Sequence, residues 1–163
     1  MDIYVVTGVG TGKTTLSAFD GALKDAGVYN YNLVGLSSVV PPNSRVIKSK
    51  SYQTPPEEYG DKLYVVKAEI RSYEVGKFLA AGIGWYQWDD GRGVFVEHEI
   101  IGDTRVAVQS EIKYKIKSSL QDLCENRGIK FKVSKIKSSL SVTRIKNQPT
   151  SVLVLAVYKS QPW

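Results

Sequence analysis

Hydrophobic and polar positions follow two periods along this chain, and each period predicts one kind of secondary structure. Short apolar runs bounded by turn residues predict strands, and several of these runs alternate with polar residues. Apolar residues at helical spacing predict two helices, over residues 14–25 and about 105–126. The predicted strands cover residues 3–6, 32–40, 63–70, 78–88, 93–101, 129–137 and 151–158. This mixture predicts a single α+β domain over residues 1–163.

The first predicted helix has recognisable ends. Thr14 or Thr15 can cap its first turn, and Gly27 is typical of a helix end. The side chains expected on its buried face are Leu16, Phe19 and Leu23. The segment 41–61 contains two Pro-Pro pairs and many polar residues, and it is therefore predicted to be a loop.

Length and composition narrow the class of protein. A chain of 163 residues with 42% hydrophobic content can bury one real core. No apolar run approaches the roughly 18 residues that span a bilayer, and the N-terminus lacks a secretion signal. A cytoplasmic protein without membrane contact is expected. Cys124 and His98 are the only residues of their types, so no zinc site with the usual ligands, and no other metal site, is expected.

The net charge of +6 raises the question of nucleic-acid binding. Much of the charge lies in the second half of the chain, where lysines alternate with apolar residues around 130–137. A strand with one solvated face explains that alternation, and lysine on an edge strand also opposes aggregation. No recognised nucleic-acid motif accompanies the charge, so nucleic acid is not an expected partner.

A glycine-rich segment, Gly8 to Thr15, resembles a phosphate-binding P-loop, but its spacing is wrong. The motif needs a glycine five places before the glycine of its Gly-Lys pair, and Thr7 stands there. The phosphate cradle depends on how many backbone amides surround the anion, so this shift matters. Residues 7–12 are predicted to form a loop, and a nucleotide-binding domain is the least favoured reading.

Two adjacent serines, Ser37 and Ser38, interrupt an apolar run that ends in a Pro-Pro pair, Asn32-Leu-Val-Gly-Leu-Ser-Ser-Val-Val-Pro-Pro42. Serine hydroxyls need partners if they are buried. One explanation is an ordinary strand end with two satisfied hydroxyls. The other is self-cleavage, because the hydroxyl of Ser38 can reach the carbonyl of Ser37. The eleven residues alone leave both explanations open.

Further motifs precede this segment in the chain. The glycine-rich segment is followed by Thr14-Thr-Leu-Ser-Ala-Phe-Asp-Gly-Ala-Leu23, then by Ala26-Gly-Val-Tyr-Asn-Tyr-Asn-Leu33, and then by the serine pair. In this order they closely resemble the pyruvoyl-dependent arginine decarboxylases. The match is dense over residues 8–42 and resumes weakly at 94–99.

The resemblance implies a fold, a maturation step and a cofactor. The fold would be a four-layer αββα sandwich of mainly antiparallel sheets. The chain would be a proenzyme that cuts itself between Ser37 and Ser38, giving fragments 1–37 and 38–163. Ser38 would become a covalent pyruvoyl group, the only cofactor. That group would be the electron sink for decarboxylation, the role that pyridoxal phosphate has elsewhere.

The resemblance also implies roles for further residues. Asn32 would assist processing, and Glu97 would donate a proton to the substrate. The residues expected to bind L-arginine are Asp20, Leu23, Tyr29 and Tyr31. Simpler roles stay open: Asn32 as a turn residue, Glu97 as a solvated carboxylate and Asp20 as a helix-surface charge. Regular alternation would put His98 on the strand face opposite Glu97.

The expected activity is conversion of L-arginine to agmatine and CO2, a step toward polyamines, by a homotrimer with substrate sites between subunits. The main alternative is an uncleaved, inactive or regulatory homologue that acts as a binding protein.

Overall fold

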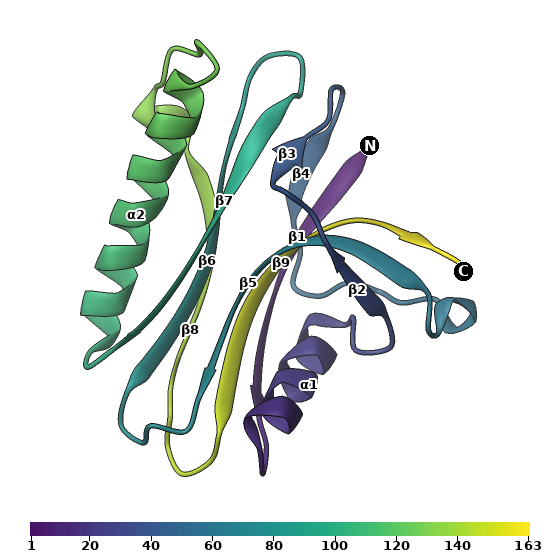
Figure 1. Ribbon diagram of the computed structural model, residues 1–163, viewed down its shortest axis with the longest axis vertical. Helices are drawn as coiled ribbons and strands as arrows, with labels where there is room; N and C mark the ends of the chain where they lie inside the picture. Colours follow the sequence, from purple (N-terminus) through teal and green to yellow (C-terminus); the bar gives the residue numbers. More distant parts are fainter.

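Two β-sheets lie face to face in the computed structural model, and each carries one helix on its outer side (Figure 1). The structure describes residues 1–163. The first sheet has the order β2 (Asn32–Gly35), β5 (Lys62–Ser72), β9 (Thr150–Gln161), β1 (Asp2–Thr11) and β4 (Arg45–Lys48). The second has the order β3 (Val39–Val40), β7 (Gly93–Gly102), β6 (Phe78–Gln87) and β8 (Lys137–Arg144). The helices are α1 (Thr15–Ala26) and α2 (Arg105–Glu125), and short 3-10 turns are η1 (Pro56–Glu58) and η2 (Val133–Lys135).

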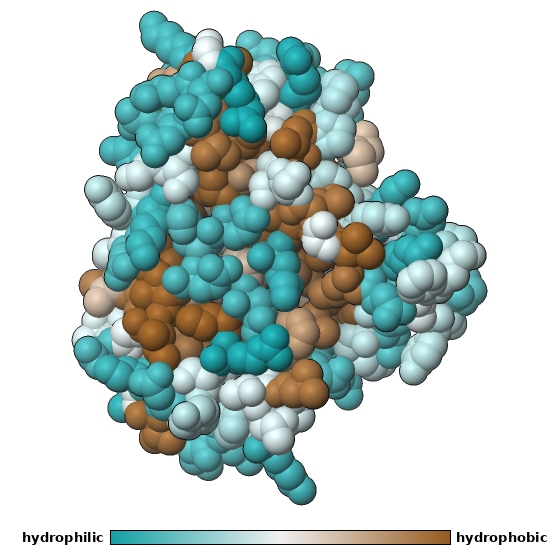
Figure 2. Space-filling model, in the orientation of Figure 1, coloured by the Kyte–Doolittle hydropathy of each residue, from teal (hydrophilic) through white to brown (hydrophobic).

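Pairing within the sheets is antiparallel except where β4 joins β1 and β2 joins β5. The predicted α+β class and the four-layer arrangement of mainly antiparallel sheets are confirmed. Neither helix is both long and apolar enough to cross a membrane. On the face shown in Figure 2, hydrophobic side chains reach the surface in patches among polar ones rather than as one continuous apolar area.

Three hydrophobic clusters hold the four layers together. The cluster between the sheets includes Trp85 and Phe95, both fully buried. A second cluster lies between α1 and the first sheet, and a third lies between α2 and the second sheet. The third is lined by one stripe of α2, namely Val108, Ile112, Ile116, Leu120 and Cys124. Full burial of an aliphatic side chain of this size stabilises by about 1.5–3 kcal/mol, so these contacts hold each layer in place.

The glycine-rich segment is part of a strand, so the predicted loop over residues 7–12 is wrong. β1 continues to Thr11 and pairs with β9 throughout this stretch. A Cβ on Gly10 would lie 2.2 Å from the carbonyl oxygen of Ala18, and one on Gly8 would lie 2.0 Å from that of Ala22. The glycines therefore let α1 approach the sheet closely, and no phosphate loop exists here.

The buried face of α1 agrees with the prediction at Leu23 and partly at Phe19, but it differs at Leu16. Ala18, Ala22 and Ala26 face the sheet with Leu23, whereas Leu16 is 69% exposed. Small side chains suit a helix that lies against glycines, and the helical pattern of large apolar residues did not reveal this. The ends were predicted correctly: Thr14 caps the helix through the backbone N–H of Ser17, and Gly27 ends it in the left-handed conformation.

Three other segments differ from the sequence-based expectation. The predicted strand 32–40 is two strands in different sheets, because the chain crosses between the sheets after residue 35. The predicted loop 41–61 contains β4 and η1. The predicted strand 129–137 is an irregular segment with η2; Ile129, Phe131 and Ile136 pack beneath α2, whereas Val133 is exposed. The actual strand there, β8, begins at Lys137.

Candidate active site

The serine pair lies where the chain passes from one sheet to the other (Figure 1). The backbone N–H of Leu36 donates to the carbonyl of Val65 at 2.9 Å, which is the last backbone-to-backbone hydrogen bond to the first sheet before the crossing. The N–H of Phe95 donates to the carbonyl of Ser38 at 2.8 Å, the first bond to the second sheet. Between them Ser37 is exposed and Ser38 has a φ of 59°. The left-handed conformation costs a non-glycine residue about 1–2 kcal/mol, so both anchors hold Ser38 under strain.

The hydroxyl of Ser38 donates to a carboxylate. Its Oγ lies 2.7 Å from Oε1 of Glu97 on β7. Glu97 is on the strand face that Phe95 uses to reach the core between the sheets. His98 lies on the opposite face, where its Nε2 is 3.0 Å from Oγ of Ser119 on α2. The predicted separation of Glu97 from His98 is confirmed, and Glu97 is in position to take the hydroxyl proton of Ser38.

Tyr158 on β9 holds the residue that follows Ser38. Its hydroxyl donates to the carbonyl of Val39 at 2.9 Å. Its ring meets that of Phe95 edge to face, with centroids 6.1 Å apart. Burial raises the pKa of Tyr158, and the nearby charge of Glu97 adds to the rise. The phenol therefore stays protonated and remains a donor. The sequence did not single out Tyr158, because nothing local marks a residue 119 positions from its partner.

A row of carboxylates continues from Glu97. Glu99 is exposed at the surface, but partial desolvation of its carboxyl raises its pKa, and the charges of Glu97 and Glu69 act in the same direction. Oε1 of Glu99 accepts the backbone N–H of Glu69 at 3.2 Å. Glu69 is itself paired with Arg71, whose Nε lies 3.0 Å from Oε1 of Glu69. Glu97, Glu99 and Glu69 thus lie close enough to influence one another, although Lys67 and Arg71 both pair with Glu69.

Comparisons with known proteins point to one family. The model of the family described as pyruvoyl-dependent arginine decarboxylase matches residues 2–162. The chain belongs to the pyruvoyl-dependent arginine decarboxylase family. The resemblance predicted from the motifs is thereby confirmed.

Relatives with that name include proteins from three organisms. The chain is 34% identical over 105 residues to the one from Thermoplasma volcanium, covering 63% of this chain and 57% of the relative. It is 36% identical over 97 residues to the one from Halobacterium salinarum, covering 58% of each. It is 39% identical over 83 residues to the one from Methanococcoides burtonii, covering 50% of this chain and 44% of the relative. The matched region thus spans less than two thirds of each of these relatives.

The residues expected to bind substrate in this family member do not surround Ser38 within one chain. Asp20 and Tyr29 are exposed, and Leu23 and Tyr31 pack in the cluster beneath α1. That cluster lies on the face of the first sheet opposite the core that contains Phe95. The hydroxyl of Tyr31 donates to Glu58, and burial raises the pKa of that phenol. The role of these four residues stays a prediction.

Asn32 is also held away from the serine pair. Its side-chain Nδ2 donates to the carbonyl of Gly60 at 2.6 Å, and its backbone N–H donates to Asp61 at 2.8 Å. These bonds fix the start of β2 beside β5. The predicted contribution of Asn32 to processing is thus not explained by a contact within this chain, and it stays a prediction.

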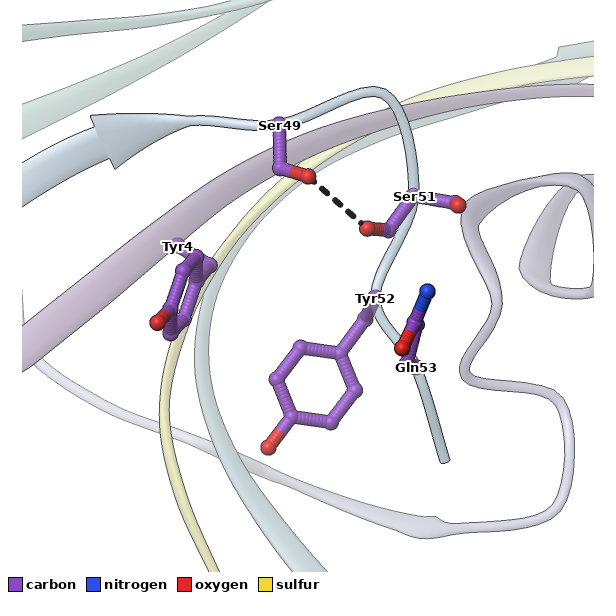
Figure 3. A pocket seen from close by; sticks show the side chains of 5 residues that line it. All are labelled: Tyr4, Ser49, Ser51, Tyr52 and Gln53. Carbon is purple, nitrogen blue, oxygen red and sulfur yellow. Dashed lines mark hydrogen bonds between the residues drawn. The ribbon is translucent and has the colours of Figure 1, made fainter. Parts of the chain in front are cut away.

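Two surface hollows are lined largely by the segment that follows β4. One, about 350 Å³, is lined by Tyr4, Ser49, Ser51, Tyr52 and Gln53 (Figure 3). The next, about 450 Å³, shares Tyr52 and includes Tyr29. Neither is lined by Ser38 or Glu97. The other larger hollows are lined by neither residue, so Ser38 and Glu97 lie outside all of them.

Proposed function

We propose that this chain is a proenzyme that cleaves itself between Ser37 and Ser38 and then converts L-arginine to agmatine and CO2. The single observation that carries the proposal is the hydroxyl of Ser38, which lies 2.7 Å from the Glu97 carboxylate at a strained crossing between two sheets. Membership of the family supplies the reaction class.

Cleavage begins with attack of the Ser38 oxygen on the carbonyl carbon of Ser37. Glu97 takes the hydroxyl proton, and the amide nitrogen of residue 38 leaves with a proton. The products are an ester between Ser37 and the side chain of residue 38, and a free amine on residue 38. The strain at Ser38 favours this step because the bond that holds the unfavourable backbone angle is broken.

Elimination then separates the fragments. Residue 38 loses its Cα proton, and its Cβ–Oγ bond breaks, so that Ser37 leaves as a carboxylate. The resulting dehydroalanine takes up one water and releases ammonia, which gives a pyruvoyl group at the start of fragment 38–163. Fragment 1–37 contains β1, α1 and β2, so it stays bound through its sheet pairing.

The residues around position 38 fit a pyruvoyl group. Phe95 N–H fixes the carbonyl that links residue 38 to Val39, and Glu97 faces its side-chain position. When formed, the group supplies the electron sink that protein side chains lack. Glu97, in its acid form, would return a proton to the substrate carbon that loses CO2.

A homotrimer would complete the substrate site. β2 pairs with β5 only as far as Val65, and β3 pairs with β7 only at residues 93–94, so both sheets keep an open edge beside Ser38. An open edge favours docking of another chain. We propose that a neighbouring protomer contributes residues to the substrate site at this boundary. Asp20 would bind the guanidinium of arginine. Leu23, Tyr29 and Tyr31 would contact the rest of the substrate.

Intact-mass spectrometry and a carbon dioxide assay test the proposal. Purified protein should appear as two fragments, with residue 38 blocked at the N-terminus, and it should release CO2 from arginine. A single uncut chain that releases no CO2 would leave the alternative of an inactive binding homologue.

A further inference from the structure

Tyr158 occupies an irregular position in β9. Along the β5–β9 ladder, Tyr64 pairs with Lys159 and Val65 pairs with Val157, so Tyr158 has no partner across the strands. It is the extra residue of a β-bulge. Bulges redirect side chains and are frequent beside active sites. Here the bulge lies where the phenol reaches across to the other sheet.

The phenol holds a segment that has few other anchors. β3 contains only two residues, and the side chain of Val39 is 56% exposed. Phe95 N–H binds the carbonyl of Ser38 on one side, and the hydroxyl of Tyr158 binds the carbonyl of Val39 on the other. Two successive carbonyls are therefore held from two different sheets. The edge-to-face contact between the rings of Tyr158 and Phe95 ties the two anchors together.

Cleavage would remove one of the links that hold this segment in place. In the uncut chain, the covalent link to Ser37 and β2 also holds residue 38. After the cut, residue 38 is a free chain end, and free ends fray unless they are tied down. A reactive group displaced by about 1 Å can lose about 10²-fold in rate. The reacting carbonyl would therefore depend on the anchors at Ser38 and Val39.

We propose that Tyr158 is a positioning residue that fixes the newly formed end of the large fragment beside Glu97. This inference rests on the proposed self-cleavage, and it concerns the state after the cut. The hydroxyl does not touch the bond that is broken, so it acts through the orientation of the Val39 carbonyl.

Tyr158→Phe removes only the hydroxyl and keeps the ring that packs on Phe95. The Val39 carbonyl is near the surface and can bind water, so the variant should fold and should still be cut. Its kcat for arginine should fall about three- to tenfold, the loss expected for one hydrogen bond, with KM changed less than about twofold. Tyr64→Phe is the matched control, because it loses a 2.8 Å bond to Gln161 elsewhere; it should keep the wild-type kcat.

Hydrogen–deuterium exchange of the cut proteins provides a readout besides activity. The amides of Val39 and Val40 should exchange at least about threefold faster in Tyr158→Phe than in wild type or Tyr64→Phe. Unchanged exchange and unchanged kcat in a cut Tyr158→Phe protein would overturn the positioning role while leaving the proposed function intact. A wild-type protein that is never cut would overturn both.

Discussion

Two segments of this chain combine residue type and backbone conformation in opposite ways. At Gly8 and Gly10 the backbone is a regular strand, but the absence of side chains lets α1 lie almost on the sheet. At Ser38 the backbone takes a left-handed conformation that suits glycine, yet a serine stands there. The first segment uses glycine to gain space for packing. The second keeps a serine despite the backbone strain, and backbone strain of this kind is frequent at functional sites.

Ser38→Ala should give the largest effect. The variant loses the attacking oxygen while the fold is retained, so the chain should stay full-length and release no measurable CO2 from arginine. A denaturing gel and intact mass report the cut. Ser37→Ala is the matched control, since its side chain is exposed and has no hydrogen-bond partner; it should still be cut. Cleavage of Ser38→Ala would show that another group is the nucleophile.

Glu97→Gln should give the next largest effect. The amide cannot take the proton of Ser38 or return one to the substrate, and such proton transfers contribute about 10²–10⁴-fold. Cutting should slow, and decarboxylation by the cut fraction should fall by about 10²-fold or more. His98→Gln, on the opposite face of the same strand, should leave both rates near wild type. Rates of cutting from timed gels and CO2 release check this, and equal effects of the two variants would exclude a special role for Glu97.

Gly10→Ala tests the other segment through stability. The added Cβ would lie 2.2 Å from backbone atoms of Ala18 and Ala22, and backbone cannot move aside as a flexible side chain can. Overpacking of this kind costs about 1–3 kcal/mol and sometimes more. Urea unfolding should show a loss of about 3 kcal/mol. Gly35→Ala, where a Cβ would meet nothing within 4 Å, should change stability by less than about 0.5 kcal/mol. Similar values for the two variants would contradict the packing role of Gly10.

The same two segments show how far sequence reasoning reaches. The motifs around Ser37 and Ser38 led to the family, and strand alternation placed Glu97 on the face opposite His98. The crossing between sheets was missed because sheet membership depends on distant partners, and residues 32–40 read as one apolar run. The glycines were taken for a loop because their partner, the alanine face of α1, is visible only once the helix is docked.

Tyr158 is a residue whose position could not be predicted from the local sequence pattern. Its strand was predicted, but the bulge arises from the register between β5 and β9, which one strand alone does not encode. In the segment 129–137, apolar and polar residues do alternate, but the backbone is irregular. Apolar side chains of this segment pack against α2 instead of forming one face of a strand. Tyr158 contacts a residue 119 positions away, and the segment 129–137 packs against the helix that directly precedes it; the local pattern of residues reveals neither contact.

The smallest expected effect is on stability, and it separates the backbone strain at position 38 from the chemistry of the Ser38 hydroxyl. Ser38→Gly and Ser38→Ala both lose the hydroxyl and its bond to Glu97, and both stay uncut, so they differ chiefly in the backbone preference of residue 38. Glycine adopts a φ of 59° without steric cost, whereas alanine does not. The glycine variant should therefore be more stable than the alanine variant by about 1 kcal/mol in urea unfolding. If the alanine variant were equally stable, Ser38 would carry no backbone strain, and relief of strain would contribute nothing to the cut. The hydroxyl beside Glu97 would then by itself have to explain why the peptide bond between Ser37 and Ser38 breaks.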